Sequence, residues 1–405
     1  MRIQISKHEP DVRQLLDIVQ QRGHHPGHVL IYAASGWRYT TSFGEVERFY
    51  WRDPDHSTNA PPQDRLFDLV LLLDLDFERA ESLATLAQAR RCIAPEGLML
   101  AHIPSGIGAS ARQTAHLRCL AGGFGQVWFH GGKEQRWKSV FRKNGVMLSA
   151  RPNGELAAQR TCSIIVPVYN ERDTFSELME LLLAKRLDHL GLRKEIILVE
   201  SNSTDGTREA IKRYEGEQGV RVLYQDGPRG KGNAVREGLR AATGDIVLIQ
   251  DADLEYDLAD YECLLEPLIQ EKAAFVLGSR LGGRLKMRNF EDQPFVGGAL
   301  NLGQVFFTWL LNRLYGQSMK DPFTMFKVFR RDCLYGLQFE CDRFDFDHEL
   351  VIKLVLKGYV PLEVPVAYSA RSFKQGKKVR VVRDTLSWLK ADFKFRFARL
   401  RPCFD

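Results

Sequence analysis

The sequence has few cysteines and no CxxC pair among them. The seven are scattered and odd in number, which excludes a disulfide scaffold, disfavours a zinc site and is typical of buried thiols in a reducing compartment. A composition of 44% hydrophobic and 27% charged residues excludes disordered and collagen-like chains. The length of 405 residues predicts two or three domains, each large enough to bury a core. The cysteines are Cys92, Cys119, Cys162, Cys263, Cys333, Cys341 and Cys403.

Long apolar runs are also missing. The first ten residues, MRIQISKHEP, lack the apolar core of a secretory signal, so we expect a cytoplasmic protein. The longest uncharged stretch, residues 293–312, is 20 residues long but carries Asn301, Gln304 and three glycines. That stretch is too polar for a typical membrane span and favours an interfacial or buried helix.

Acidic side chains are scarce near the C-terminus. Residues 371–405 contain 11 Lys or Arg and three Asp, a net charge of +8, whereas the whole chain carries +6. Within this segment, residues 383–400 predict an amphipathic helix that can lie on an anionic membrane; the alternative is a helix docked on the protein with a solvated basic face. Its apolar face is Leu386, Leu389, Phe393, Phe397 and Leu400, with Trp388 nearby, and Arg383, Lys390, Lys394 and Arg401 lie elsewhere.

Two stretches alternate strand-like and helix-like patterns, and a polar joint at 149–160 separates them. In the first, a strand at 66–73, a helix at 77–91, a turn at 94–97 and a strand at 98–103 form a βαβ unit. The fold class we predict is α/β with two α/β domains. The predicted ranges are 1–150 for the first domain, 151–160 for the linker, 161–370 for the second domain and 371–405 for the basic segment.

The second domain predicts a mostly parallel sheet, because helices separate its short aliphatic strands. Ligands of such sheets bind at the carboxyl ends of the strands. Polar clusters follow three of those ends, at 167–171 (PVYNE), 200–207 (ESNSTDGT) and 250–257 (QDADLEYD). Each cluster alone could be turn and cap chemistry, but together they predict one shared site. The strands are 162–168, 195–199, 220–224 and 245–250.

The acidic cluster is the strongest of these signals. On an extended backbone Asp251, Asp253 and Glu255 would project from one side, and three adjacent carboxylates repel each other. A hard divalent cation, Mg²⁺ or Mn²⁺, would relieve that repulsion and bind phosphate oxygens as well. Such an ion suits the departure of a nucleoside diphosphate from a carbon centre, which is group transfer from an activated donor. The alternative is a solvated acidic loop.

A glycine-rich loop at 227–232 (GPRGKG) precedes a predicted helix. It would bring Arg229, Lys231 and backbone N–H groups near phosphate, although a plain basic loop is also open. The loop does not match GxxxxGK[ST], because Gly232 follows Lys231, so a P-loop nucleoside triphosphatase is disfavoured.

These motifs together resemble a known family. PVYNE, the DGT turn, RGKGNAVREGLRAATGD, QDADLEYD and GSR (278–280) occur in the order of family-two glycosyltransferases of the GT-A fold. KDPFTMFKVFRR (320–331), CDRFDFDHEL (341–350), EVPVAY (363–368) and RSFKQGKK (371–378) look like the dolichol-phosphate mannosyltransferase branch, which makes polyprenyl-phosphate sugars. The resemblance covers residues 160–400. It implies an inverting transfer of a hexose from GDP- or UDP-hexose to a polyprenyl phosphate at the cytoplasmic membrane face.

The resemblance also implies site residues. Asp251 and Asp253 would be metal ligands, with Glu255 where the branch often has Gln as a third ligand. Arg280 would reach the diphosphate or sugar, and with Asp251 and Asp253 it forms the catalytic set. Glu200 stands where the branch usually has an Asp that contacts the nucleotide base or ribose. The identity of the nucleotide base is therefore left open. The nucleotide- and phosphate-contacting residues are Pro167, Tyr169, Asn170, Glu171, Glu200, Asp205, Lys231, Arg371, Lys377 and Lys378.

A general base for a hydroxyl acceptor is hard to find. Many relatives carry an ED pair after the core, whereas here Glu291-Asp292 comes early, in a loop. A lipid monophosphate is already an anion and needs no base, so its attack depends on positioning. Other acids remain as alternatives: Asp345, Asp347 and Glu349 as bases, and Asp321 and Glu349 as scaffold or sugar contacts.

The first domain gives weaker signals. Residues 66–104 resemble the later half of class I methyltransferases that use S-adenosylmethionine, but no GxGxG turn follows 28–34. We predict a degenerate, non-catalytic domain for docking, dimerisation or regulation. His24, His25 and His28 lie among prolines and glycines with no nearby acid, which favours a surface loop over a metal site.

Two other functions stay open. One is a glycosyltransferase with a saccharide hydroxyl acceptor in polysaccharide or glycoconjugate synthesis. The other is a non-catalytic glycosyltransferase-like binding module whose basic tail grips a membrane or nucleic acid. We expect an anionic membrane surface as a partner and no nucleic acid, and the sequence leaves the oligomeric state open.

Overall fold

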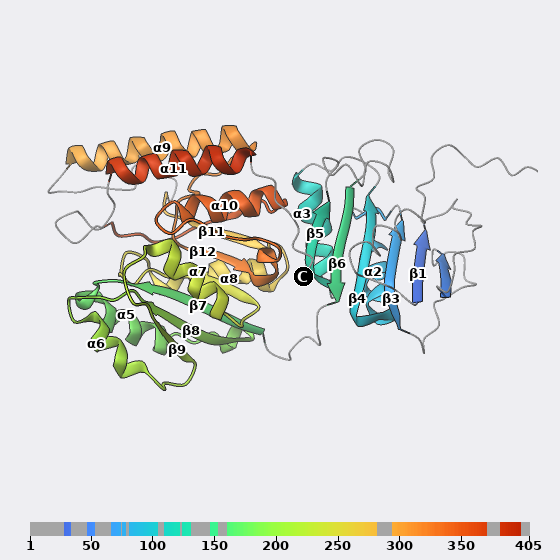
Figure 1. The fold of residues 1–405 in the computed structure, drawn as a ribbon, viewed down its shortest axis with the longest axis horizontal. Helices are drawn as coiled ribbons and strands as arrows, with labels where there is room; N and C mark the ends of the chain where they lie inside the picture. The colour runs from blue at the N-terminus through green and yellow to red at the C-terminus, as the bar shows by residue number, and fades with distance from the viewer. Residues whose placement is uncertain are drawn as a thin grey trace, which may run out of the picture. The chain divides into compact units, whose positions relative to one another are not determined.

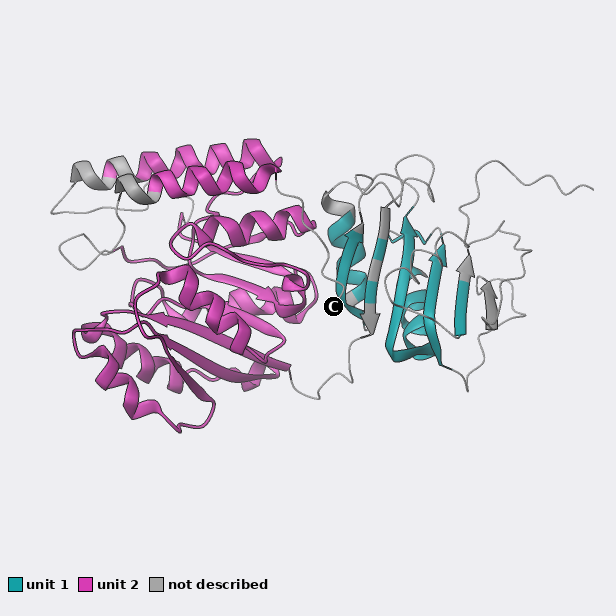
Figure 2. Cartoon of the chain, in the orientation of Figure 1, with its two compact units in different colours: residues 1–156, 402–405 teal, residues 157–401 magenta. Residues whose placement is uncertain are grey.

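The structure is a computed structural model in which the chain forms two compact units, residues 1–156 with 402–405 and residues 157–401 (Figure 2). The division falls inside the stretch predicted as a linker, and the four predicted domain ranges stay predictions. The residues that the structure describes are 28–33, 47–52, 66–73, 75–77, 81–103, 109–121, 124–130, 146–152, 160–281, 294–370 and 381–397.

The first unit is built on a six-stranded sheet in the order β2-β1-β3-β4-β6-β5. β6 runs antiparallel to both of its neighbours, and the other pairings are parallel. The predicted turn at 94–97 is wrong, because those residues continue β4, with a register shift opposite Phe67 and Leu69. The elements are β1 (His28–Ala33), β2 (Glu47–Arg52), β3 (Phe67–Leu73), α2 (Glu81–Cys92), β4 (Ile93–Ile103), α3 (Ala109–Ala121), β5 (Phe124–His130) and β6 (Val146–Pro152).

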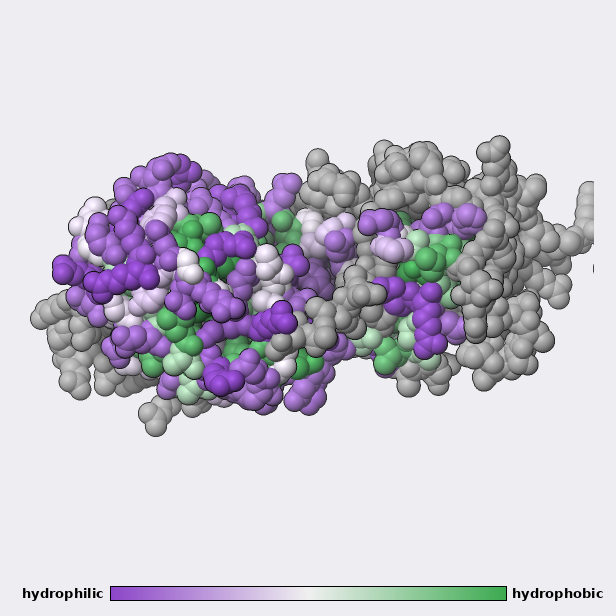
Figure 3. Space-filling view, turned by 90° about the horizontal axis from the view of Figure 1, so that it is seen from below, coloured by the Kyte–Doolittle hydropathy of each residue, from purple (hydrophilic) through white to green (hydrophobic). Residues whose placement is uncertain are grey.

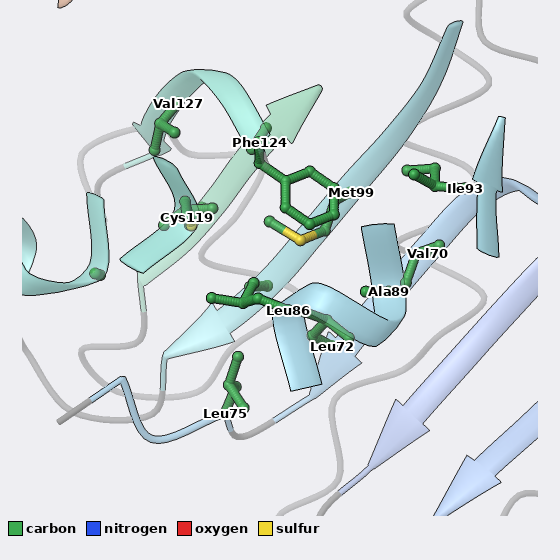
Figure 4. Packing of buried hydrophobic residues seen from close by; sticks show 14 of the residues in the cluster. Val70, Leu72, Leu75, Leu86, Ala89, Ile93, Met99, Cys119, Phe124 and Val127 are labelled. Carbon is green, nitrogen blue, oxygen red and sulfur yellow. The ribbon is translucent and has the colours of Figure 1, made fainter. Parts of the chain in front are cut away.

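Helices and strands of this unit share one hydrophobic core. Figure 4 shows Leu72 of β3 and Met99 of β4 packed with Leu86 of α2 and Cys119 of α3, all buried. A run such as β3 is apolar along nearly its whole length because parallel strands are covered on both faces. Of the three histidines considered above, His24 and His25 lie outside the described residues, and the His28 amide donates to Asp68 Oδ2 at 3.0 Å.

The second unit contains a seven-stranded sheet in the order β13-β11-β12-β10-β7-β8-β9. Only β12 is antiparallel to its neighbours, so the predicted mostly parallel sheet is confirmed. The four strands predicted from aliphatic runs are β7 to β10. The strands are β7 (Arg160–Val168), β8 (Leu192–Glu200), β9 (Val220–Tyr224), β10 (Ile246–Ile249), β11 (Phe275–Ser279), β12 (Lys327–Arg330) and β13 (Leu362–Pro365).

Its helices form where apolar residues recur at helical spacing. In α5, Phe175, Leu178, Met179 and Leu182 lie three or four residues apart and are buried together. The helices are α5 (Arg172–Ala184), α6 (Thr207–Ile211), α7 (Lys231–Ala241), α8 (Tyr261–Ile269), α9 (Pro294–Tyr315), α10 (Phe346–Lys357) and α11 (Val381–Phe397), with 3-10 turns at Asp188–Leu190, Lys212–Tyr214, Leu258–Asp260 and Arg331–Leu334.

α9 and α11 lie side by side along one edge of this unit, and both contact α10 (Figure 1). The Tyr315 hydroxyl donates to the carbonyl oxygen of Asp392 at 2.6 Å, and His348 Nδ1 lies 2.7 Å from Asp392 Oδ1. These contacts join all three helices. Within the described part of the chain, no helix combines the length and apolarity that crossing a membrane requires.

Candidate functional site

The acidic segment after β10 is bent rather than extended. Asp253 Oδ1 accepts the Glu255 amide at 3.1 Å, and the Tyr368 hydroxyl donates to Glu255 Oε2 at 2.7 Å. Tyr256 also pairs with Tyr368 in an isolated antiparallel bridge. The expectation that three carboxylates share one side of an extended backbone is therefore wrong, because a turn at Asp253 directs Glu255 toward Tyr368.

Lys231 forms an ion pair with Asp251. The lysine is the first residue of α7, and its ammonium lies 5.9 Å from the centre of the Phe344 ring. Burial alone would lower the pKa of Lys231, but the carboxylates of Asp251, then Asp347 and Asp253, outweigh it and raise the pKa. The site therefore groups one ammonium with three acids, two from the segment after β10 and one from α10.

The donor set at Asp251 and Asp253 fits a hard cation. Among the described residues, no group of three or more His, Cys, Asp or Glu side chains is arranged to hold a metal ion. Mg²⁺, however, is usually bound by one or two carboxylates together with substrate phosphates. Asp251 and Asp253 match that requirement, whereas Glu255 is bonded to Tyr368. The metal-ligand assignment stays a prediction.

The PVYNE segment is hydrogen-bonded to the loop after β8. Asn170 has a positive φ of 50°, which asparagine tolerates; its amide donates to Ser203 Oγ at 3.0 Å, and its Oδ1 accepts the Thr204 amide at 2.8 Å. The Glu171 amide donates to Thr207 Oγ1 at 3.0 Å. The structure therefore brings together two of the predicted polar clusters. Pro167 is the last residue but one of β7, Tyr169 follows the strand directly, and both are half-buried.

Asp205 forms hydrogen bonds between the loop after β8 and the start of α5. Its carboxylate accepts the Thr207 amide at 3.0 Å and the Arg172 amide at 3.1 Å. Burial would raise the pKa of Asp205, but the hydrogen bonds from Thr207 and Arg172 outweigh it and lower the pKa. In this structure the side chain caps the turn that positions the loop.

Glu200 is completely buried and bonded to the protein itself. Oε1 accepts the Ser203 amide at 2.6 Å, and Oε2 pairs with the Arg208 guanidinium at 3.0 Å. Both oxygens therefore have protein partners at the position predicted to face the base or ribose. Arg208, which the sequence analysis missed, is 29% exposed and lies over the Tyr224 ring at 4.8 Å.

A chain of side-chain hydrogen bonds connects four segments beneath the site. Ser201 Oγ donates to Gln225 Oε1 at 2.8 Å, and Gln225 Nε2 donates to Asn233 Oδ1 at 2.9 Å. Asn233 Nδ2 in turn donates to Asp342 Oδ1 at 2.9 Å. These bonds fix β8, β9, α7 and the segment before α10 relative to one another. No spacing in the sequence predicted them, because the partners come from distant segments.

Two of the three glycines of the GPRGKG loop are required by packing, and Gly227 is not. Gly230 has a φ of +109°, and a Cβ there would collide with the carbonyl oxygen of Asp342. A Cβ at Gly232 would lie 2.5 Å from the Phe346 Cβ and 2.8 Å from the carbonyl oxygen of Cys341. The loop therefore presses against the segment before α10, and this contact places Lys231 at the site. Arg229 is exposed.

Arg280 is held by Asp321 rather than extended into solvent. Arg280 Nε and Nη2 donate to the two carboxylate oxygens at 2.8 and 2.7 Å, and the Arg280 amide adds a bond of 2.9 Å. Gln304 Nε2 donates to the same carboxylate at 2.8 Å. Asp321 is fully buried, and although burial raises its pKa, Arg280 outweighs it and lowers the pKa. Of the two predicted roles of Asp321, the structure supports scaffold.

The candidate bases on and before α10 differ in their surroundings. Glu349 is fully buried and accepts the amides of Glu340 and Cys341, the latter at 2.8 Å, which is a scaffold role. Asp345 accepts the Arg343 amide at 3.1 Å. Asp347 pairs with Lys327 Nζ at 3.2 Å and reaches the site. Arg371, Lys377 and Lys378 lie outside the described residues.

A family comparison decides what kind of domain carries this site. A model of glycosyl transferase family 2 matches residues 163–336. Those residues form a glycosyl transferase family 2 domain. The predicted resemblance to this family and the α/β fold class are confirmed. The family 2 domain contains the predicted site residues from Pro167 to Arg280, whereas Asp347 and Glu349 follow it.

Curated relatives match about half of the chain. A dolichol-phosphate mannosyltransferase of Pyrococcus furiosus is 28% identical over 219 residues, 53% of this chain and 58% of the relative. An undecaprenyl-phosphate 4-deoxy-4-formamido-L-arabinose transferase of Edwardsiella ictaluri is 27% identical over 219 residues, 53% and 62% of the two chains. A low-salt glycan biosynthesis hexosyltransferase of Haloferax volcanii is 26% identical over 211 residues, which are 52% of this chain and 48% of the relative. The chain thus spans less than two thirds of each relative.

Two solved structures are similar at low identity. The mannosyltransferase PcManGT from Pyrobaculum calidifontis, in complex with GDP-Man and Mn²⁺, is 20% identical with a TM-score of 0.41, covering 61% of this chain and 68% of that one. Mannosyl-3-phosphoglycerate synthase from Rubrobacter xylanophilus is 20% identical with a TM-score of 0.44, covering 61% and 78%.

Proposed function

We propose that the family 2 domain transfers a hexose from a nucleoside-diphosphate sugar to a polyprenyl phosphate, inverting the anomeric carbon, at the cytoplasmic face of a membrane. The family match supports glycosyl transfer. Relatives whose names include dolichol phosphate and undecaprenyl phosphate support the lipid acceptor. One observation on the structure also supports a lipid acceptor: α9 and α11 expose an apolar surface.

Asp251, Asp253 and Lys231 are the proposed donor site. The two carboxylates would hold Mg²⁺ or Mn²⁺, which supplies charge neutralisation for the departing diphosphate. Lys231 adds an ammonium at the same place, and a cation fixed beforehand stabilises developing negative charge without reorganising. The loops at 167–171 and 200–207 would form the wall for the nucleotide.

The surroundings of two candidate bases, Glu349 and Asp347, support a phosphate acceptor over a saccharide hydroxyl. A hydroxyl needs a group that takes its proton, whereas a phosphate monoester is already an anion. Glu349 is buried and bonded to backbone amides, and Asp347 is paired with a buried ammonium. Neither is placed as a free base, so positioning is the main contribution that the protein makes to the acceptor.

α9 exposes a stripe of large apolar side chains. Leu302, Val305, Phe306 and Trp309 recur at helical spacing and are 48–72% exposed. Such a stripe on a helix that does not span a membrane is typical of interfacial binding, in which apolar side chains enter the headgroup boundary. By contrast, the face of this unit seen in Figure 3 is mainly hydrophilic, with apolar residues in separate small groups.

α11 adds apolar and basic side chains to the same edge. The sequence predicted that the apolar and the basic side chains of this helix lie on different faces. That prediction is wrong, because Leu386, Phe393 and Phe397 are exposed in one stripe with Lys390 and Lys394. The opposite face is docked, with Ala391, Asp392 and Phe395 buried. Asp392 is buried, and although Lys394 pairs with the exposed Glu340 at 2.8 Å, Lys390 and Arg396 add exposed positive charge, so the edge suits an anionic membrane. Leu400 and Arg401 lie outside the described residues.

For the first unit we keep the proposal of a non-catalytic methyltransferase-like domain. Its sheet has helices between parallel strands and one antiparallel strand, β6, next to an edge. The segment that would carry a cofactor-binding turn, 34–46, lies outside the described residues.

The test is a panel of GDP- and UDP-hexoses with undecaprenyl phosphate and Mn²⁺ or Mg²⁺, followed by mass spectrometry of the lipid fraction. We expect a lipid-linked hexose with one donor and none with Asp253→Ala. Asp257→Ala is the matched control, because Asp257 also accepts the amide two residues on, at 2.8 Å, yet is exposed. If the donor is hydrolysed but no lipid product forms, the result favours a different acceptor, such as a saccharide hydroxyl. If neither reaction occurs, the result favours a non-catalytic binding module.

A further inference from the structure

Gln304 is a polar side chain on the docked face of α9. Phe307 and Leu311, which share this face of the helix with it, are both buried. Gln304 Nε2 donates to Asp321 Oδ1 at 2.8 Å. Arg280 already pairs with both oxygens of this buried carboxylate, so neutralising the charge of Asp321 does not require Gln304. The bond from α9 therefore needs another explanation.

Arg280 lies at the edge of the sheet where a ligand is expected. β10 and β11 both run antiparallel to β12, so they run in the same direction and their carboxyl ends share one edge. Asp251 comes shortly after β10, and Arg280 follows β11 directly. The Arg280 guanidinium is 5.2 Å from the centre of the Tyr368 ring, whose hydroxyl donates to Glu255 Oε2 at 2.7 Å. Arg280 therefore lies beside the acidic segment after β10.

Asp321 leaves one nitrogen of Arg280 for a ligand. The carboxylate accepts from Nε at 2.8 Å and from Nη2 at 2.7 Å. Nη1 has no hydrogen-bond partner among the described residues, and the side chain is 6% exposed. Because the guanidinium is a rigid plane, holding its Nε and Nη2 edge also fixes the direction of Nη1. Arginine N–H groups are strong donors to phosphate oxygens.

We infer that Gln304 is a positioning residue: its amide fixes the Asp321 carboxylate, which aims Nη1 of Arg280 at a phosphate group of the nucleotide sugar or of the lipid. The inference rests on the proposed function. A carboxylate and a guanidinium that hold only each other can still move as a pair, and a bond from a second element removes that freedom. A donor fixed in this way stabilises negative charge without reorganising during the reaction.

A purely structural role of Gln304 makes a different prediction. If the amide only fastened α9 to the domain, its loss would loosen α9 and weaken vesicle binding, and the loss of activity would not depend on residue 280. If Gln304 acts through Arg280, its loss slows transfer only while the arginine is present. A double-mutant cycle separates the two.

The experiment measures transfer by the full-length protein with the nucleotide sugar that the wild type uses, undecaprenyl phosphate and MnCl₂. Gln304→Met keeps the length of the side chain but removes its N–H groups. We expect it to lower kcat/KM about tenfold, and less than about twofold in an Arg280→Lys background. KM is determined for each substrate separately, and a rise in one of them identifies the substrate whose phosphate Arg280 contacts.

Gln317→Met is the matched control. The Gln317 amide donates to the carbonyl oxygen of Tyr315 at 3.2 Å, at the end of α9, so this substitution removes a similar bond from the same region and should leave kcat/KM unchanged. Sedimentation of Gln304→Met with phosphatidylglycerol vesicles should match the wild type, because the exposed stripe of α9 is intact. If Gln304→Met fails to fold, Gln304→Asn replaces it: the amide is kept but is too short to reach Asp321, and the same loss is expected.

Three results would overturn this inference alone: unchanged kcat/KM in a folded Gln304 variant, an equal loss in the Arg280→Lys background, or a loss of vesicle binding that accompanies the loss of activity. If the wild type forms no lipid-linked hexose with any donor, the proposed function fails and this inference fails with it.

Discussion

At the scale of single residues, the buried cations of the second unit differ in what compensates them. Arg280 and Lys327 face carboxylates, whereas Lys357 donates to the carbonyl oxygens of Cys333 and Tyr335 at 3.0 and 2.6 Å. Burial lowers the pKa of Lys357 to about 7, and the acidic groups Cys333 and Asp332 offset this only in part. The protein therefore has a lysine that releases its proton near neutral pH when the chain is folded.

This lysine predicts that stability rises with pH above 7. The unfolded chain keeps the lysine charged up to its ordinary pKa of 10.5, so between pH 7 and 10.5 the unfolded state binds more protons. Stability then rises by up to about 1.4 kcal/mol per pH unit, and the full penalty is present below pH 7. Urea unfolding at pH 6.5–7.5, well below the ordinary thiol pKa of 9.0, should show this slope in the wild type and not in Lys357→Met. An equal slope in both proteins would contradict the assignment.

Residue-level prediction from sequence was most specific where the signal was local, although the roles of those residues stay predictions. Asp251, Asp253 and Lys231 belong to short motifs, and the structure places them together. The partners that define other side chains come from far along the chain: Asp321 lies 41 residues after Arg280, and Asp392 lies 44 after His348. Spacing within a motif cannot show such pairs, because only the folded chain brings them together.

At the scale of elements, β7 to β10 were predictable because buried parallel strands are continuous aliphatic runs. β12 was not predicted, since its four residues include Lys327 and Arg330, whose burial depends on ion pairs. The acidic segment was predicted as extended, but its hydrogen bonds to its own backbone and to Tyr368 bend it. Local side-chain bonding of Asp competes with strand geometry there.

The paired helices α9 and α11 predict reversible binding to anionic membranes. Phe306→Glu and Trp309→Glu place charges in the apolar stripe of α9 and should reduce sedimentation with phosphatidylglycerol vesicles at least about tenfold. Leu181→Glu is the control, because Leu181 is 45% exposed on α5, away from this edge, and should bind as the wild type does. Binding should also weaken with salt, since basic side chains contribute. Vesicle binding that survives both α9 substitutions would show that another surface contacts lipid.

At the scale of the whole molecule, each unit has its own sheet and its own buried side chains. Alternating strands and helices with a polar joint are enough to predict two such units from sequence. The order of strands is not, because β12 follows β11 in the chain yet lies between β11 and β10 in the sheet, and nothing local specifies that position. The predicted site residues that the structure describes lie on the second unit.

Two separate cores predict two separate unfolding transitions in calorimetry of the full-length protein. Leu86→Ala creates a cavity in the first core and should cost that unit about 2–5 kcal/mol, lowering one transition only. Ile164→Ala, at a fully buried position of β7, is the counterpart and should lower only the other. A nucleoside diphosphate with MnCl₂ should raise only the transition that Ile164→Ala lowers, because a ligand stabilises the folded unit that binds it. If both substitutions shifted one common transition, the units would unfold as a single cooperative body, and the prediction of two separate transitions would be wrong.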